Sequence, residues 1–410
     1  MRLKVLLNPL FVIPSLFLAQ ALFWLLFMPE VPTVPGVAPR YESEVALLKW
    51  FALFTPFVIG IATGVMAPLR GTRSTHSAVP VRTRRYMWRL ISATLLVALL
   101  GEMVYIRDVI ANPEFVKRGF EEGNLAIVGE EVRAQRIIGI SSLNNLFILP
   151  VALLALIAMD PRAPGGERKR ATKLLWLVGL FTLFHSLFLA ARMFMVYFAL
   201  VILGTYLLLN SHRRFALKAL LSLFVLMIGV IWVGELLRGG LAYARSTSQD
   251  LVSVDVQKYV FERLIQAYIA SDFNNALVLL DCVPSGSLFS TTALASLLKI
   301  DASYSDCPNW KSSYGTVNVL ALWWFDFGYW AVLVASIIGW FIGFSYKMAL
   351  SLRAFGLSSA LYLIVYPGLF SILRINYFGL SIFLLPAATW FLAFVVSQGL
   401  VSLRQRVVAE

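Results

Sequence analysis

The sequence predicts an all-α polytopic membrane protein with about ten transmembrane helices, in a range of ten to twelve. Hydrophobic residues make up 59% of the 410 positions and charged residues only 14%, a composition outside that of soluble globular domains. In addition, several apolar runs reach the roughly 17 to 25 residues that a helix needs to cross a bilayer. Because only helices and closed barrels satisfy their backbone within lipid, runs of this length predict helical spans.

The expected spans follow one another along the whole chain. The N-terminal run is too long for the core of a signal peptide, so we expect it to be retained as the first span. A single helix over 174–209 would reach about 54 Å against roughly 30 Å of hydrocarbon, which predicts two short spans meeting near Arg192. The spans are expected near 5–28, 46–68, 90–106, 137–159, 174–190, 193–209, 219–236, 327–346, 357–373 and 377–400.

The charge pattern predicts the orientation of these spans. The formal net charge of +13 would suggest a nucleic-acid partner in a soluble chain. Here, however, more than half of the Lys and Arg residues fall in one set of alternating loops that holds few acids. The positive-inside rule then puts both termini in the cytoplasm and the loops 107–136 and 238–315 outside. We therefore expect membrane lipid, and no nucleic acid, around this chain.

Three regions follow from this topology. Residues 1–237 form an N-terminal transmembrane bundle, 238–315 a long polar insert outside the membrane, and 316–410 the C-terminal transmembrane helices. Apolar residues recur at helical spacing from Val256 to Phe273, which predicts an amphipathic helix on the membrane surface or on the bundle. We expect the insert to act as an ordered lid.

Both cysteines of the chain, Cys282 and Cys307, lie in this insert. An outside location and a spacing of 25 residues favour a disulfide, and two unpaired thiols are the alternative. Closing a loop of this size stabilises the fold by roughly 3 kcal/mol in the chain-entropy model.

Arginines gather at the predicted outer face. Arg192 and Arg374 lie at the outer ends of spans, and Arg238, Arg245 and Arg263 lie in the insert. A guanidinium at such a depth can simply extend to lipid headgroups. Because its planar fork also binds phosphate oxygens bidentately, the set predicts a cationic pocket for a lipid-linked diphosphate.

Candidate proton acceptors are few. Asp272 and Glu262 could accept a proton from a substrate hydroxyl, although an acid on a helix surface is usually only solvated. His185, near the outer end of the fifth span, is expected to be buried and hydrogen-bonded. The outside loops contain no Asp-x-Asp and their acids are scattered, so we expect no metal and no cofactor.

The order of several short motifs resembles the Wzy-type oligosaccharide repeat-unit polymerases, the O-antigen polymerase group. These motifs are AAR at 190–192, YIASDFNN at 268–275, YGTVN at 314–318 and FDFG at 325–328. The resemblance implies a GT-C-like glycosyltransferase in the bacterial inner membrane. It would join undecaprenyl-diphosphate-linked repeat units on the periplasmic face, as in lipopolysaccharide or exopolysaccharide biosynthesis, with a chain-length regulator as a candidate partner.

The resemblance also implies that arginines hold the diphosphate, namely Arg192, Arg238, Arg245, Arg263 and Arg374. We expect Arg192 and Asp272 to be catalytic, and Tyr268 and Asn275 to contribute to the substrate site.

Three other functions stay open. An O-antigen ligase has similar topology but generally carries a histidine in the large outside loop, and 238–315 has none. A flippase or other transporter of lipid-linked oligosaccharide would be favoured by charged residues deep in several spans. A membrane scaffold would not need arginines at the outer ends of two spans.

Overall fold

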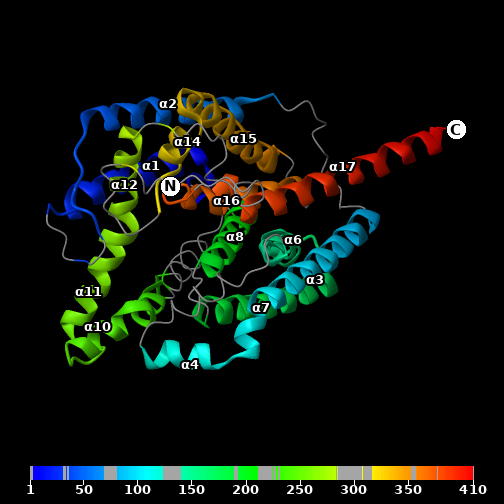
Figure 1. Cartoon of the computed structure of the whole chain (residues 1–410). Coiled ribbons are helices and arrows are strands. Elements are labelled where there is room, and N and C mark those ends of the chain that lie inside the picture. The colour runs from blue at the N-terminus through cyan, green and yellow to red at the C-terminus, as the bar shows by residue number, and fades with distance from the viewer. Residues whose placement is uncertain are drawn as a thin grey trace.

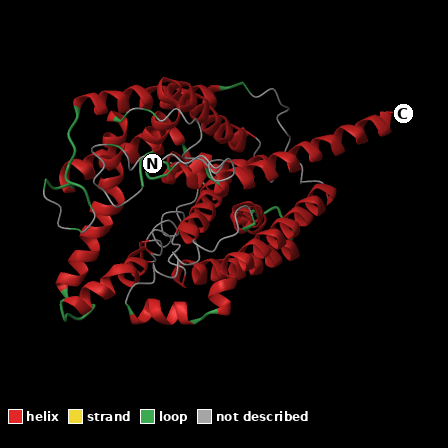
Figure 2. Cartoon of the chain, viewed as in Figure 1, coloured by secondary structure: helices red, strands yellow, loops and turns green. Residues whose placement is uncertain are grey.

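A computed structural model of the full chain (Figure 1) describes most of the protein in residue detail. The described residues are 3–30, 34, 37–68, 81–122, 140–188, 193–210, 225, 228–229, 231–282, 284, 307, 316–351, 357–375 and 377–409. Every regular element among them is helical (Figure 2). The all-α prediction is therefore confirmed for the part of the chain that the structure describes.

The described helices follow one another along the chain. The first half contains α1 (Pro9–Phe27), α2 (Glu44–Met66), α3 (Val81–Ala111), α4 (Glu114–Glu121), the 3-10 helix η2 (Ser141–Phe147), α6 (Ile148–Met159), α7 (Gly165–Phe188) and α8 (Met193–Asn210). The second half contains the π-helix η3 (Leu236–Gly240), α10 (Leu241–Ser246), α11 (Val254–Ile265), the π-helix η4 (Gln266–Ala270), α12 (Ser271–Asp281), α14 (Val319–Phe327), α15 (Ala331–Ser351), α16 (Leu357–Ser371) and α17 (Ser381–Ala409).

Five helical stretches are long and apolar enough to cross a membrane, which agrees with the predicted membrane protein. They are Pro9–Phe27, Glu44–Met66, Arg84–Val104, Ser142–Met159 and Val319–Leu350. Shorter apolar helices cover Met193–Leu209, Leu357–Ser371 and Ser381–Ser397. The expected break near Arg192 falls on 189–192, which lie outside the described residues. Most of the expected span 219–236 lies outside the described residues, and the total of about ten remains a prediction.

Two glycine pairs hold α2 and α15 in close contact. Gly60 and Gly64 of α2 face the α15 backbone, and Gly339 and Gly343 of α15 face the α2 backbone. A Cβ atom at any of the four would overlap main-chain atoms of the opposite helix. This is the small-xxx-small packing by which membrane helices approach closely, and Figure 1 shows the two helices side by side.

The polar insert begins with a helical hairpin and then enters the core. α11, η4 and α12 run on without interruption from Val254 to Asp281. α11 buries only Val256, Val260 and Ile265, as an amphipathic helix should, whereas α12 buries every residue from Ser271 to Leu280. The lid interpretation thus does not describe α12, which packs against α1, α2 and α14.

The physical reason for this difference is visible in the sequence around the π-helix η4. Its i→i+5 turn adds a residue to the helical repeat and so changes which face points inward. After it, the run 276–280 is apolar on all sides, and a stretch that is hydrophobic all round is expected to be buried. The first half of α12 carries four polar residues, whose burial is balanced by hydrogen bonds: Ser271, Asp272, Asn274 and Asn275.

Candidate functional site

Three segments that are distant in sequence meet at the start of α12. They are the first turn of α12, the strand-like segment 316–318 before α14, and the turn 372–375 after α16. Two backbone hydrogen bonds join the last two, from Val317 N to Arg374 O (3.0 Å) and from Val319 N to Ile372 O (2.9 Å). The start of α14 and the end of α16 are thereby tied to each other.

Asp272 lies at the centre of this junction, with its side chain 1% exposed. Its Oδ1 accepts a hydrogen bond from Thr316 Oγ1 (2.5 Å), and its Oδ2 lies 3.7 Å from Arg374 Nε. Among the described residues, Oδ2 accepts no hydrogen bond. Burial raises the pKa of Asp272 to about 7, although Arg374 and the Thr316 hydrogen bond act in the opposite direction. The carboxyl group can therefore exchange a proton near neutral pH.

The side chain of Arg374 is 26% exposed, whereas that of its partner Asp272 is 1% exposed. The Nε side of the guanidinium faces the buried carboxylate, and a planar guanidinium carries five N–H donors in all. An arginine held in this way can present a fixed charge to an anion.

Amides surround the ion pair. Asn275 Nδ2 donates to Thr316 O (3.1 Å), and Asn318 N donates to Asp272 O (3.3 Å). Asn318 Nδ2 donates to Gln20 Oε1 (2.9 Å), and Gln20 Nε2 donates to Leu373 O (2.8 Å). This network connects α1, α12, α14 and the turn that carries Arg374, so the site is built by four parts of the chain.

A further amide of α12, Asn274, fixes the helix to the N-terminal part of the bundle. Its Oδ1 accepts from Trp24 Nε1 (3.1 Å) and from Tyr41 N (2.7 Å), and its Nδ2 donates to Pro39 O (3.0 Å). Three of the four hydrogen-bonding positions of the amide are used. Asn274 therefore fixes the rotation of α12 and, with it, the direction of Asp272.

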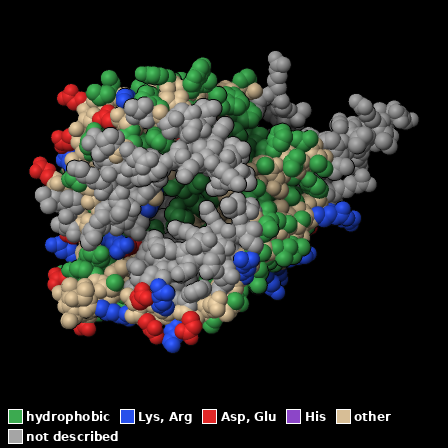
Figure 3. Space-filling view, viewed as in Figure 1, with side chains coloured by type: hydrophobic (Ala, Val, Ile, Leu, Met, Phe, Trp, Pro, Cys, Tyr) green, Lys and Arg blue, Asp and Glu red, His purple; other side chains and the backbone are tan. Residues whose placement is uncertain are grey.

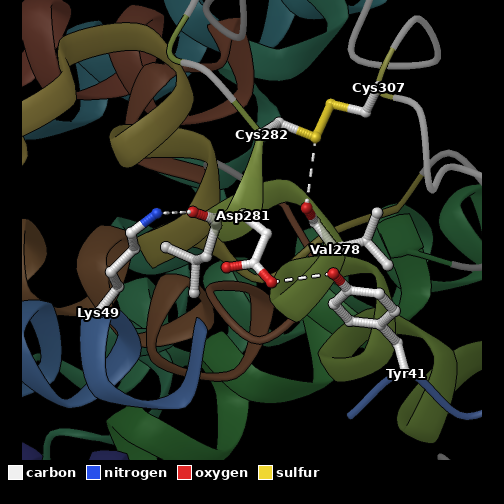
Figure 4. Close-up of a disulfide and its surroundings, with 7 residues drawn as sticks. Tyr41, Lys49, Val278, Asp281, Cys282 and Cys307 are labelled. Atoms are coloured by element: carbon white, nitrogen blue, oxygen red, sulfur yellow. Dashed lines mark hydrogen bonds between the residues drawn. A yellow bond between two sulfur atoms is a disulfide. The ribbon is translucent and has the colours of Figure 1, made fainter. Parts of the chain in front are cut away.

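The far end of α12 carries the predicted disulfide, which the structure confirms (Figure 4). Cys282 and Cys307 have their Cα atoms 5.9 Å apart, within the ordinary range for a disulfide. Beside it, Tyr41 OH donates to Asp281 Oδ2 (2.9 Å) and Lys49 Nζ donates to Leu280 O (2.7 Å). Both ends of α12 are thus fixed.

The other predicted site residues have separate surroundings. Arg263 Nε lies 2.7 Å from Glu235 Oε1, an acid with no exposed surface, and its guanidinium covers Gly239. Arg245 is exposed and donates to the carbonyl oxygen of Glu121. Arg238 and Tyr268 are described only as backbone, in η3 and η4 respectively, and Arg192 lies outside the described residues.

Only one of the five predicted arginines, Arg374, is described in contact with another predicted site residue. Of the predicted site residues, the structure joins Asp272, Asn275 and Arg374, through Thr316. Arg263 precedes Asp272 by nine positions, which is about 14 Å along a continuous helix. Convergence of all five arginines stays a prediction.

A second polar cluster lies between α3, η2 and α7. Glu102 Oε1 is 2.5 Å from His185 Nδ1, and its Oε2 accepts from Asn144 Nδ2 (3.1 Å). All three side chains are buried. The expectation that His185 is buried and hydrogen-bonded is confirmed.

Figure 3 shows that this face of the molecule is hollowed near its centre, with hydrophobic side chains at the bottom of the hollow. It lies over the region where Figure 1 draws α8 and α16. Among the described residues, no three His, Cys, Asp or Glu side chains come together in a way that could hold a metal ion.

Sequence reasoning missed several members of both clusters. Gln20 and Glu102 are single polar residues within apolar runs, which is itself the available signal. Thr316 and Asn318 lie in the YGTVN motif at 314–318, but their partners cannot be identified without the fold. A comparison of the chain with protein-family models, curated protein sequences and solved structures gives no match.

Proposed function

We propose that this protein is a polymerase of lipid-linked oligosaccharide repeat units, acting at the outer face of a bacterial inner membrane. In this proposal Arg374, together with Arg192, binds the diphosphate of an undecaprenyl-linked glycan. The fold would be GT-C-like, with about ten spans and both termini in the cytoplasm.

One observation carries the proposal: two of the motifs behind the family resemblance contact each other. Asp272 and Asn275 belong to YIASDFNN, and Thr316 and Asn318 belong to YGTVN. Three hydrogen bonds join the two motifs, and the ion pair to Arg374 lies at the same point. Motifs separated by about forty residues thus build one site beside a partly exposed arginine.

The geometry favours a division of roles in this site. Asp272 is too buried to touch a substrate hydroxyl in this conformation, so we assign to it the positioning of Arg374 in place of the expected general base. During transfer, the acceptor hydroxyl would attack the anomeric carbon while the bond from that carbon to the diphosphate oxygen breaks. The electron pair leaves with the diphosphate, whose growing charge a fixed guanidinium stabilises. The hydroxyl proton would pass to the departing phosphate.

A second candidate function has an observation of its own. The Glu102–His185 pair is an ionisable pair within the bundle, and Glu102 lies in the stretch Arg84–Val104 that is apolar enough to span. Such pairs often serve proton relays in transporters. A proton-coupled transporter of lipid-linked oligosaccharide is therefore the runner-up.

The two functions can be distinguished by the glycans that accumulate when the gene is deleted. A polymerase leaves single repeat units on lipid at the outer face, and wild-type protein, but not Arg374→Ala at equal protein level, restores the ladder. Arg118→Gln, a change to an exposed arginine on α4, is the matched control. Repeat units retained at the cytoplasmic face would instead indicate the transporter. Full-length polymer that stays on its lipid carrier would indicate the ligase.

A further inference from the structure

Glu102 and His185 are far in sequence from the other charged residues of the helices that carry them. Glu102 is the only charged residue of α3 between Arg89 and Arg107, and His185 is the only ionisable residue of α7 beyond Lys173. η2, α6 and α8 contain no charged residue at all between their first and last positions. An ionisable pair placed in such surroundings is a candidate for function, because its cost in stability must be offset.

The hydrogen bonds of the cluster define its chemistry. A carboxylate only accepts, so Glu102 Oε1 fixes the proton of a neutral His185 on Nδ1, at 2.5 Å. Asn144 Nδ2 donates to the other carboxylate oxygen at 3.1 Å, which holds the carboxyl plane in place. In this arrangement Nε2 is the atom at which the imidazole takes up a further proton.

A small cavity adjoins these groups. Its volume is about 10 Å³, close to the space that the centre of one water molecule needs. Glu102, Asn144, Thr182 and His185 supply its polar lining, and the remaining lining residues are Ala98, Leu99, Phe147, Phe181 and Phe194. Glu102 and His185 are the only ionisable side chains among these described lining residues.

We propose that Glu102, Asn144 and His185 form a proton-binding site inside the bundle, with room for one water molecule. In one state the carboxylate and the neutral imidazole carry a net charge of −1. Uptake of one proton from bulk solvent at Nε2 gives an imidazolium–carboxylate pair of net charge zero. The site is distinct from the Asp272–Arg374 junction and does not depend on the proposed polymerase activity.

The site also has a mechanical consequence. The ring of His185 lies 4.5 Å from the ring of Phe194, and the neighbouring Ser186 Oγ accepts from Met195 N (3.2 Å). The end of α7 and the start of α8 are therefore joined by residues that touch or adjoin the cluster. Uptake of a proton at His185 would change the packing of α3, η2, α7 and α8 together.

The direct test uses the low histidine content of the chain, which has three. In the full-length protein with His76→Gln and His212→Gln, ¹⁵N-labelled histidine reports on His185 alone, and the cluster itself is unaltered. Spectra in lipid bilayers are recorded between about pH 5 and pH 9. We expect the Nδ1-protonated tautomer at the alkaline end and a growing doubly protonated fraction on acidification.

Glu102→Gln, compared with the exposed Glu122→Gln as control, tests the partnership. Loss of the carboxylate should reduce the doubly protonated fraction of His185 several-fold at a given pH, whereas the control should match the parent. A His185 that keeps one protonation state over the whole range would overturn the proposal. So would a titration that Glu102→Gln leaves unchanged.

Discussion

The two buried carboxylates, Asp272 and Glu102, have different bases beside them. Asp272 faces Arg374, which cannot lose its charge and is 26% exposed. Glu102 faces His185, which can change its charge and is 3% exposed. The first pair can present a fixed charge to an outside ligand, whereas the second can only gain or lose a proton in an enclosed space. The role of each buried acid thus depends on whether its basic partner is exposed and whether that partner can lose its charge.

The largest effect should come from removing the exposed partner. Arg374→Ala is expected to abolish polymer, since the diphosphate loses its fixed counter-charge and Asp272 loses its ion pair. The measurement is the lipid-linked glycan ladder at matched protein level. Arg374→Lys keeps a point charge but loses the fork, so we expect partial activity from it. Equal ladders for Arg374→Ala and wild type would remove Arg374 from the site.

The next largest effect is a loss of stability when His185, the buried partner of Glu102, is removed. His185→Ala would leave Glu102 buried with only Asn144 as a hydrogen-bond donor among the described contacts, which should lower stability by about 2 to 4 kcal/mol. The thermal midpoint in nanodiscs measures this loss. In the double variant Glu102→Leu with His185→Ala, much of the loss should return because no charge remains buried. If His185→Ala is as stable as the parent protein, the interaction between Glu102 and His185 is contradicted.

The pH dependence of stability should separate the two carboxylates further. The pKa of Asp272 is about 7 in the folded protein, against 3.8 for an ordinary Asp, so the folded state binds the proton more tightly. Its contribution to stability is complete below about pH 4 and is lost as the pH rises through about 7, by a few kcal/mol in all. Asp272→Asn should flatten the profile in this window, and the exposed Asp255→Asn should not.

The smallest effect is expected at an exposed arginine of the insert. Arg245→Gln removes a contact from an exposed side chain to the Glu121 carbonyl, and its effect on stability should stay within about 0.5 kcal/mol. Its effect on the glycan ladder shows whether Arg245 belongs to the pocket. An unchanged ladder would remove Arg245 from the diphosphate site.

The sequence was a good guide to the parts of the fold that depend on composition. Apolar runs predicted α1, α2 and α8 closely, and the compartment argument predicted the pairing of Cys282 with Cys307. The burial of α12 was not predicted, because the π-helix before it changes the inward face in a way that a constant helical period cannot represent.

The candidate site was predictable to the extent that charge alone indicates it. Arg374 was found from its place at a span boundary and Asp272 from its place in the insert, and the structure brings them together. Thr316 and Gln20 could not be assigned, since their roles depend on hydrogen bonds to segments far away in sequence. Glu102 was overlooked because an acid near the end of a span usually reaches solvent, whereas here Asn144 and His185 enclose it.

The central claim is that the Arg374 guanidinium binds a diphosphate while the buried Asp272 carboxylate holds the guanidinium in position. Binding of undecaprenyl diphosphate to the purified full-length protein in nanodiscs tests it most directly, with Arg374→Gln compared with Arg118→Gln. We expect saturable binding to wild type and to Arg118→Gln, and at least about tenfold weaker binding to Arg374→Gln, since a charge-assisted hydrogen bond contributes about 1.5 to 3 kcal/mol. Equal affinity of the three proteins would contradict the account.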